Sequence, residues 1–304
     1  MRALHPKLQA LQAQLAPSPL QRLQDEVFSN HGVECWIKRD DLLHPVISGN
    51  KWRKLKAILD EALRIGTDTV VSMGGAHSNH LHALAYAGKC LGLKTMAYVR
   101  GERPGTLNPT LRDLLAWDME LRFVSRSVYR ELRNYKAHDS LPDLRAGQYW
   151  LPEGGATELA LKGVAEIVRE IDIDYDVLAV ACGTGTTLAG LIAVLPAKTY
   201  ALGFAALKGG GFLNDDVERL LMGLPVERRE WQILLDYHFG GFGKTPPALL
   251  DFIRQFQSRH AVALEPIYTG KMFYGLYDLV QKGHFRAGQR IVALHTGGLQ
   301  GNRS

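Results

Sequence analysis

The sequence has few cysteines, no long hydrophobic run and no concentration of charge of one sign. Its three cysteines, Cys35, Cys90 and Cys182, are too few for a disulfide framework, so we expect a reducing compartment. No stretch approaches the roughly 18 apolar residues of a membrane span, and the N-terminal segment lacks the apolar core of a signal peptide. The formal net charge of +5 is scattered along 304 residues rather than gathered in the stripe of a nucleic-acid binder. We therefore expect a cytoplasmic protein without nucleic-acid or membrane partners.

What the sequence does contain is a regular alternation of strand-like and helical patterns. Strands separated by helices predict mostly parallel sheets that helices cover on both faces. Ligands of such sheets bind beyond the carboxyl ends of the strands. The expected strands are 33–40, 68–73, 94–101, 120–125, 175–181, 198–206, 261–268 and 289–296, and the expected helices are 51–66, 78–92, 106–118, 157–171 and 187–195.

One basic cluster interrupts the even spread of charge. The stretch SGNKWRKLK, residues 48–56, carries three lysines and an arginine. Such a cluster could be the solvated face of a helix. However, the turn signal Gly49-Asn50 places Lys51 near a helix N-terminus, where the macrodipole disfavours a lone cation. This position favours a chemical role for Lys51, such as that of an amine nucleophile.

The stretch ACGTGTTLAG, residues 181–190, follows a buried strand and opens a helix. The backbone amides of such a turn converge on one point and suit a phosphate. A dinucleotide fingerprint would need glycine where Leu188 stands, and the P-loop lysine is also missing. We therefore expect a monophosphate, and a tight turn that binds nothing is the alternative. The predicted nest consists of Gly183, Thr184, Gly185, Thr186 and Thr187.

The stretch GGAHSNHLH, residues 74–82, follows another strand. Ser78 and Asn79 stand at a helix start, where exposed amides and short polar side chains suit a carboxylate. Its three histidines could suggest a metal site, but their spacing matches no usual zinc pattern and no cysteine or acid lies close by. We expect no metal, and we expect His80 to be a neutral hydrogen-bonding group near a ligand.

Two further strand ends carry hydroxyl groups. In EPIYTGKMFYG, residues 265–275, a strand is expected to end at Tyr268. A tyrosine in this position could simply be a buried hydroxyl that finds a partner. In ALHTGGLQG, residues 293–301, Thr296 follows a buried strand. An amine nucleophile, a phosphate nest, a carboxylate site and a tyrosine at strand ends together describe a site for pyridoxal 5'-phosphate (PLP) and an amino acid.

These motifs, in the order KRDDL, SGNKWRKL, GGAHSNH, PEGGAT, CGTGTTLAG, YTGK and HTGG, resemble those of the 1-aminocyclopropane-1-carboxylate deaminase/D-cysteine desulfhydrase family of PLP enzymes. The resemblance extends from about Pro17 to Gly301. It implies the α/β fold of the tryptophan synthase β subunit (PLP fold type II), with two three-layer α/β/α domains, mostly parallel sheets and PLP in the cleft. The larger domain would comprise residues 1–50 and 160–304, and the smaller inserted domain residues 51–159.

The resemblance also implies roles for individual residues. Lys51 would carry PLP as a Schiff base, Lys54 and the nest would hold the phosphate, and Asn79 would bond the 3'-oxygen. Ser78 and His80 would hold the substrate carboxylate, Tyr268 would stand close to the substrate, and Thr269 would lie by the pyridine nitrogen. Thr296 is a second hydroxyl for that nitrogen, and the choice between the two threonines stays open. The family resemblance further implies a homodimer.

This chain departs from the deaminases at three positions. The deaminases carry Gln where this chain has His80, Glu where it has Thr269, and a tyrosine that corresponds to Phe242. A hydroxyl beside the pyridine nitrogen does not keep the ring protonated as a carboxylate does, so the ring withdraws electrons less strongly. β-Elimination tolerates a neutral ring because the leaving group removes the electrons. The departures therefore favour the desulfhydrase side of the family.

The expected reaction is β-elimination from a small amino acid such as D-cysteine, with Lys51 or Tyr268 removing the α-proton and with pyruvate, sulfide and ammonia as products. The alternatives are ring-opening deamination of 1-aminocyclopropane-1-carboxylate to 2-oxobutyrate and ammonia, or another PLP reaction such as racemisation. Two other classes of protein would share the glycine-rich turn. They are a nicotinamide dehydrogenase, which Leu188 disfavours, and a PLP-binding module without turnover, which Lys51 and Tyr268 disfavour.

Overall fold

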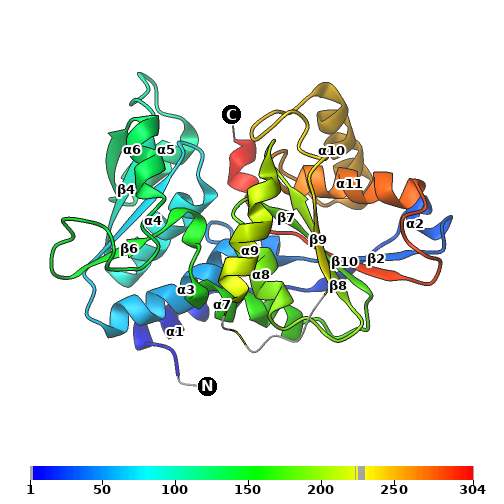
Figure 1. Cartoon of the computed structure of the whole chain (residues 1–304), viewed down its shortest axis with the longest axis horizontal. Coiled ribbons are helices and arrows are strands. Elements are labelled where there is room, and N and C mark those ends of the chain that lie inside the picture. Colours follow the sequence, from blue (N-terminus) through cyan, green and yellow to red (C-terminus); the bar gives the residue numbers. More distant parts are fainter. Residues whose placement is uncertain (1–2, 223, 225–229, 304) are drawn as a thin grey trace.

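The computed structural model describes residues 3–222, 224 and 230–303, and it folds into two α/β parts that lie next to each other (Figure 1). Within the described residues, one part is built on a six-stranded sheet and the other on a four-stranded sheet. Helices cover both faces of each sheet, which confirms the predicted three-layer arrangement. The domain limits 51–159 and 160–304 stay a prediction.

The six-stranded sheet has the order β1-β2-β10-β7-β8-β9. Only the edge strand β1 is antiparallel, and every other pairing in the sheet is parallel. Because the chain reverses its strand order around β10 and β7, the loops after these two strands lie at a topological switch point, where ligands of such sheets bind. The strands are β1 (Leu20–Leu23), β2 (Glu34–Lys38), β7 (Val177–Cys182), β8 (Tyr200–Ala205), β9 (Trp231–Leu234) and β10 (Arg290–Leu294).

The alternation of side chains along β7 explains why this strand is entirely apolar. Val177 and Ala179 pack with α2 (Glu26–Ser29), α10 (Pro247–His260) and α11 (Thr269–Gln281) on one face. Their neighbours Leu178 and Val180 pack on the other face, against three further helices. A strand buried on both faces needs apolar residues at every position. The helices of the second face are α7 (Glu158–Arg169), α8 (Thr186–Ile192) and α9 (Leu213–Leu221).

The four-stranded sheet is parallel throughout, in the order β5-β4-β3-β6. One face packs against α1, α3, α4 and α5, and the other packs against α6. The strands are β3 (Thr69–Gly74), β4 (Lys94–Arg100), β5 (Glu120–Val124) and β6 (Gln148–Leu151). The helices are α1 (Pro6–Gln12), α3 (Gly49–Arg64), α4 (Asn79–Leu91), α5 (Pro109–Ala116) and α6 (Arg126–Leu132).

The predicted strand at 261–268 is wrong. These residues form no ladder, and Tyr268 is the cap residue of α11. The reason lies in Glu265, whose carboxylate folds back and accepts the amides of Ile267, Tyr268 and Thr269, which then have no free N–H for a neighbouring strand. The short strands β1, β6 and β9 and the helices α1, α2, α6, α9 and α10 were not predicted. Among the described residues, no helix is long and apolar enough to cross a membrane.

Candidate active site

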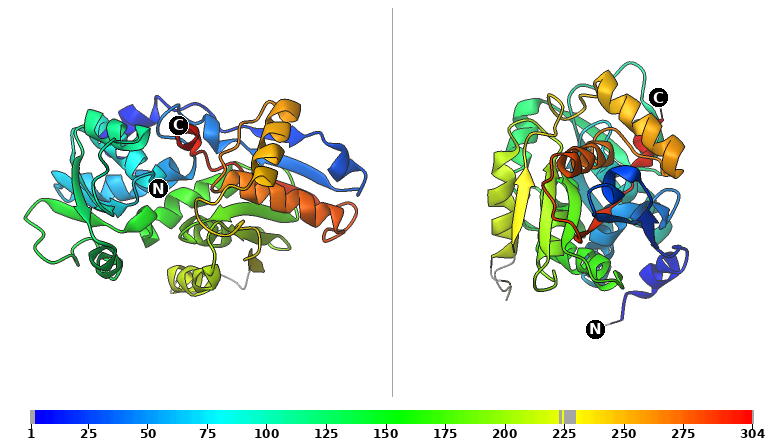
Figure 2. Two further views of the ribbon diagram at one scale, coloured as in Figure 1. Left: turned by 90° about the horizontal axis from the view of Figure 1, so that it is seen from above. Right: turned by 90° about the vertical axis from the view of Figure 1, so that its right-hand side faces the viewer.

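The loops after β3, β7 and β10 meet the start of α3 between the two sheets. A Cβ at Gly49 would collide with the carbonyl of Thr296, so the start of α3 touches the loop after β10. A Cβ at Gly183 would lie 2.9 Å from the ring of Tyr268, so the loop after β7 touches the start of α11. The C-terminal segment lies between the two parts in Figure 1 and in the left view of Figure 2. In this segment, Gln300 Nε2 donates to Asn79 Oδ1 over 2.5 Å. The predicted site residues are therefore brought together.

The basic cluster of α3 is not a solvated face, because most of it is buried. Arg53 makes a bidentate pair with the buried Asp40, with Nη2–Oδ1 and Nε–Oδ2 distances of 2.9 and 3.1 Å, and it also pairs with Glu170. Lys56 pairs with Glu166. Arg53 thus connects α3 to the segment after β2 and to Glu170, the residue that follows α7. Lys56, three positions further on, connects α3 to α7 itself.

The other two cations of the cluster, Lys51 and Lys54, have no carboxylate partner among the described residues. Lys51 Nζ donates to Asn50 Oδ1 over 2.8 Å, and Lys54 Nζ donates to the Gly154 carbonyl over 3.1 Å. Burial lowers the pKa of Lys51 to about 8, although the negative charge of Glu265 opposes this shift. Burial and the neighbouring Lys51 lower the pKa of Lys54 well below its usual value. Lys54 is buried and Lys51 is half-buried, and two neighbouring amines without a counter-charge favour an anion and also supply a nucleophile.

The predicted phosphate nest forms the turn between β7 and α8. Gly185 has φ +70° and caps α8, a conformation that glycine adopts without strain. The hydroxyls of Thr184 and Thr186 lie 3.0 Å apart, and the Thr187 hydroxyl accepts from Asn50 Nδ2 over 2.7 Å. Asn50 therefore links the nest to Lys51, a connection that spans 137 residues and that the sequence did not reveal.

Ser78 and Asn79 begin α4, as the sequence predicts. Ser78 is the cap residue, and its Oγ accepts the Leu81 amide over 3.2 Å, so its own hydroxyl hydrogen stays available. Because Gln300 occupies Asn79 Oδ1, the amide NH2 of Asn79 is the group left for a ligand. Gln300 therefore orients Asn79, and sequence reasoning missed it, since a glutamine six residues after a strand carries no motif.

His80 is a neutral imidazole with one committed nitrogen and one free nitrogen. Ser72 Oγ donates to the Leu151 carbonyl over 2.7 Å, so it accepts from His80 Nε2, 2.9 Å away. Nδ1 then carries a lone pair, and it is buried without a partner among the residues that the structure describes. Burial, reinforced by the charges of Lys51 and Lys54, lowers the pKa of His80 to about 3. The free nitrogen of His80 is thus a hydrogen-bond acceptor at any working pH.

Tyr268 and Thr269 are held by Glu265, a buried acid that sequence reasoning did not single out. Its carboxylate accepts from the amides of Ile267, Tyr268 and Thr269, at 2.5–3.1 Å, and from the Thr269 hydroxyl at 3.1 Å. Burial raises the pKa of Glu265, and these amides pull it back down. Burial also raises the pKa of Tyr268, helped by Glu265 and Glu153, so its phenol stays protonated. The capping geometry was visible in the sequence only as an acid four residues before a helix.

Thr296 and Phe242, which stands where the deaminases have a tyrosine, also lie in this region. Thr296 is buried next to the start of α3, and its hydroxyl has no partner within the described part of the chain. The Phe242 ring stands edge-on to Tyr268, with ring centroids 5.7 Å apart, and is 52% exposed. Phe242 therefore forms an outer wall of the site.

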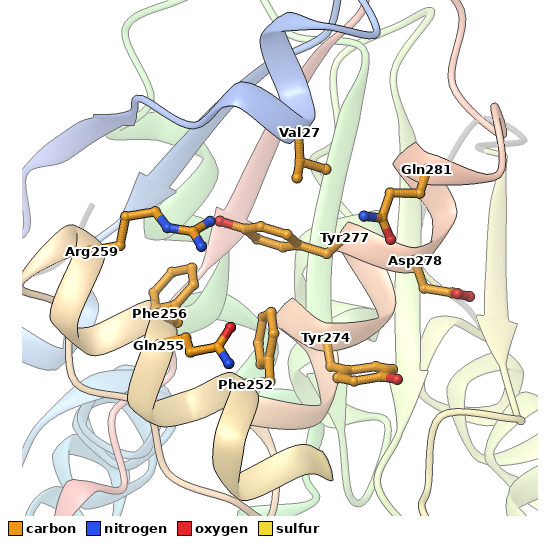
Figure 3. Close-up of a pocket in the computed structure, with 9 residues that line it drawn as sticks. All are labelled: Val27, Phe252, Gln255, Phe256, Arg259, Tyr274, Tyr277, Asp278 and Gln281. Atoms are coloured by element: carbon orange, nitrogen blue, oxygen red, sulfur yellow. The ribbon is translucent and has the colours of Figure 1, made fainter.

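A further cavity lies away from these loops. It has a volume of about 240 Å³ and lies between α2, α10 and the far half of α11, where Phe252, Arg259, Tyr274 and Tyr277 line it (Figure 3). At a rise of about 1.5 Å per residue, Tyr277 is about 12 Å along α11 from Thr269. This cavity is therefore separate from Lys51. Among the described residues, no group of three or more His, Cys, Asp or Glu side chains could hold a metal ion.

Within the described residues, the site between the sheets has two unmet requirements. The half-buried amine of Lys51 and the buried amine of Lys54 lack an anion, and the buried Nδ1 of His80 lacks a donor. PLP carries a phosphate for the amines and the nest, an aldehyde for Lys51, and a ring nitrogen for a hydroxyl. The residues present therefore fit this cofactor.

Comparisons with known proteins agree with this fit. The model of the pyridoxal-phosphate dependent enzymes matches residues 11–297. A Pyrococcus horikoshii protein provisionally named 1-aminocyclopropane-1-carboxylate deaminase is 35% identical over 98% of this chain and 96% of its own length. The bifunctional D-cysteine desulfhydrase/1-aminocyclopropane-1-carboxylate deaminase of Arabidopsis thaliana is 32% identical over 94% of this chain and 77% of its own.

A solved structure gives the same result for the fold. The crystal structure of a homologue of the cyclopropane deaminase superposes with a TM-score of 0.81 at 32% identity, covering 99% of this chain and 97% of that one. The match to the family model, the identity over nearly the whole length and the superposition confirm the family and the fold that the motifs predicted. The chain belongs to the pyridoxal-phosphate dependent enzymes, in the 1-aminocyclopropane-1-carboxylate deaminase/D-cysteine desulfhydrase family.

Proposed function

We propose that this enzyme catalyses β-elimination from D-cysteine or a closely similar small amino acid, releasing sulfide, pyruvate and ammonia. The observation that carries the proposal is that both side chains available to the ring nitrogen, Thr269 and Thr296, are hydroxyls, whereas the deaminases have a carboxylate at the position of Thr269. The buried carboxylate of Glu265 does not take the place of the deaminase carboxylate, because its oxygens already accept hydrogen bonds from the backbone and the hydroxyl at the start of α11. His80 in place of glutamine supports the same side of the family.

Under this proposal, Lys51 would carry PLP through its amine, and Lys54 with Gly183–Thr187 would hold the phosphate. Asn79 would donate its NH2 group to the 3'-oxygen. Bound PLP supplies the electron-withdrawing ring that makes the α-proton of an amino acid acidic. Lys51, whose pKa is about 8, is the better of the two predicted bases. Tyr268 remains a hydroxyl group that can position substrate, because its pKa is raised.

The two candidate hydroxyls for the ring nitrogen differ in what they can still donate. The hydrogen of the Thr269 hydroxyl is engaged by Glu265, whereas the hydroxyl of Thr296 is uncommitted within the described residues. We therefore assign the ring nitrogen to Thr296. A threonine hydroxyl in this place would leave the pyridine ring largely uncharged. Elimination of a good leaving group tolerates such a neutral ring.

The substrate carboxylate is best assigned to Ser78 and the first amides of α4. The Ser78 hydroxyl retains its hydrogen, and the N-terminus of this 13-residue helix favours negative charge. His80 was expected to share this role, but Nδ1 is an acceptor and would repel a carboxylate oxygen. We therefore propose that His80 Nδ1 accepts a hydrogen bond from the substrate, from its ammonium or thiol group.

The test is a pair of steady-state assays on the purified enzyme with its cofactor. We expect faster release of sulfide and pyruvate from D-cysteine than of 2-oxobutyrate from 1-aminocyclopropane-1-carboxylate. Faster turnover of the cyclopropane substrate would replace this proposal by deamination. Interconversion of D- and L-cysteine without pyruvate would replace it by racemisation. We further propose a homodimer, which light scattering of the purified protein tests.

A further inference from the structure

Lys271, on the first turn of α11, is a buried cation with no role in the steps proposed above. Its side chain is 1% exposed, and no carboxylate pairs with it within the described residues. Instead, its Nζ donates to the carbonyls of Ala206 and Gly241, at 3.1 and 2.9 Å. A buried ammonium group is costly unless its donors are used, so these two bonds are the reason that the lysine can stay there.

The two carbonyls belong to different sides of the active site. Ala206 follows β8, and its amide donates to the carbonyl of Cys182, next to the phosphate nest. Gly241 lies in the loop 238–244, in which Phe239, Gly240, Gly241 and Gly243 all have positive φ. Apart from the turn hydrogen bonds that Gly240, Gly241 and Lys244 donate within the loop, a backbone with so many left-handed residues has little preference for one shape. An external tether therefore has a large influence on this loop.

Phe242 follows the tethered Gly241 directly. Its ring is exposed on one side and meets the edge of Tyr268 on the other, at 5.7 Å between centroids and 70° between planes. Tyr268 in turn touches Gly183 of the nest. A continuous series of contacts thus leads from the Lys271 ammonium group to the aromatic wall beside the proposed substrate.

We propose that Lys271 is a positioning residue that fixes Phe242 against Tyr268, and that Phe242 is the specificity-determining wall for the substrate side chain. This proposal rests on the proposed amino-acid site at Tyr268. A phenyl ring offers no donor or charge, so the wall favours a small, uncharged β-substituent such as a thiol and disfavours a carboxylate or an ammonium group.

The test uses Lys271→Met, which keeps the length of the side chain and removes the donors. Lys282→Met, on the exposed far end of the same helix, is the matched control. With cofactor bound and no substrate present, we expect chymotrypsin to cleave the 238–244 loop about tenfold faster in Lys271→Met and at the wild-type rate in Lys282→Met. Because this measurement needs no turnover, it stands even if the proposed reaction is wrong. An unchanged cleavage rate would overturn the tether.

The second arm is a double-mutant cycle with Phe242→Ala, run on whichever amino acid the wild type converts fastest. If Lys271 acts through Phe242, each single variant raises KM about tenfold with a smaller change in kcat, and the double variant is no worse than Phe242→Ala. Lys271→Arg, which keeps a donor, should recover part of the loss. Additive effects would overturn the proposal, as would a wild-type KM in Phe242→Ala. If Lys271→Met fails to fold, Lys271→Arg and Phe242→Ala form the cycle.

Discussion

The two faces of the helix α3 differ in how the chain neutralises their charge. Arg53 and Lys56 meet carboxylates from outside the helix, whereas Lys51 and Lys54, on neighbouring positions, meet only an amide oxygen and a carbonyl. The first pair fastens the helix to its surroundings. The second pair leaves two amines inside the protein without a carboxylate partner among the described residues, which a structural role would not require. Amines without a counter-charge therefore distinguish the site from the scaffold, although both pairs consist of the same types of residue.

The largest expected effect is that of Lys51→Ala. Without the amine, turnover should fall by at least about 10³-fold, because both the covalent attachment and the base are lost. Borohydride reduction followed by peptide mapping should label the wild type at Lys51 and should not label the variant. Lys56→Ala, on the paired face, is the control and should be labelled like the wild type. A label on Lys54 or Lys56 would reassign the cofactor lysine.

Arg53→Met should be the most damaging change on the paired face. It leaves Asp40, which is fully buried, without its bidentate partner, and breaking a buried pair in this way costs about 3–5 kcal/mol. Urea unfolding of the cofactor-free protein measures the loss. If the free energy of unfolding falls by less than about 1 kcal/mol, the Arg53–Asp40 pair does not stabilise the fold. The paired cations of α3 would then not differ from Lys51 and Lys54 in this respect.

Lys54→Met should give the opposite result. The cofactor-free protein should be as stable as the wild type or more stable, because a buried amine with a lowered pKa is replaced by an apolar group. Cofactor affinity should fall about 10- to 100-fold, since a charge-assisted contact with the phosphate is lost. Spectroscopic titration with PLP gives the affinity. A variant that loses stability and keeps its affinity would place Lys54 with the scaffold.

A smaller effect is expected from Ser72→Ala, which removes the acceptor that keeps the His80 proton on Nε2. Without the Ser72 oxygen to accept from Nε2, either nitrogen can carry the proton, and the acceptor at Nδ1 is no longer fixed. We expect a fall of about tenfold in kcat/KM for D-cysteine. Nitrogen-15 NMR of His80 should report a mixture of tautomers. Thr95→Ala, at another buried hydroxyl of the same sheet, is the control. A single Nε2-protonated tautomer in Ser72→Ala would contradict the assignment.

The smallest effect concerns pH. The pKa of Lys51 in the folded, cofactor-free protein is about 8, below the value of an unfolded lysine near 10.4. Between these values the unfolded chain binds more protons, so stability should rise with pH from about 8 to about 10. The gain should be on the order of 1 kcal/mol relative to Lys51→Met, after allowance for partial solvent exposure. Equal pH dependence in both proteins would mean that Lys51 has an ordinary pKa.

Much of the architecture was predictable because it depends on local patterns. Apolar runs of strand length that alternate with amphipathic helices predicted β3, β4, β5, β7, β8 and β10, and the Ser78 cap predicted the start of α4. The strand predicted at 261–268 failed because Glu265 uses the amides that a ladder would need. The edge strands β1 and β9 were missed because each has only four residues and pairs with a single neighbour.

The sequence by itself determined the family, the alternating α/β order and the set of residues gathered at the strand ends, because motifs and periodicity are written in consecutive residues. Only the tertiary structure decided which charges are paired and which atoms remain free. Asp40 lies opposite Arg53, Ser72 fixes the proton of His80, Gln300 turns the amide of Asn79, and Glu265 engages Thr269. The physical reason is that desolvation and hydrogen-bond saturation depend on what surrounds a group in three dimensions, and even a partner 4 to 13 residues away is brought into place only by the fold.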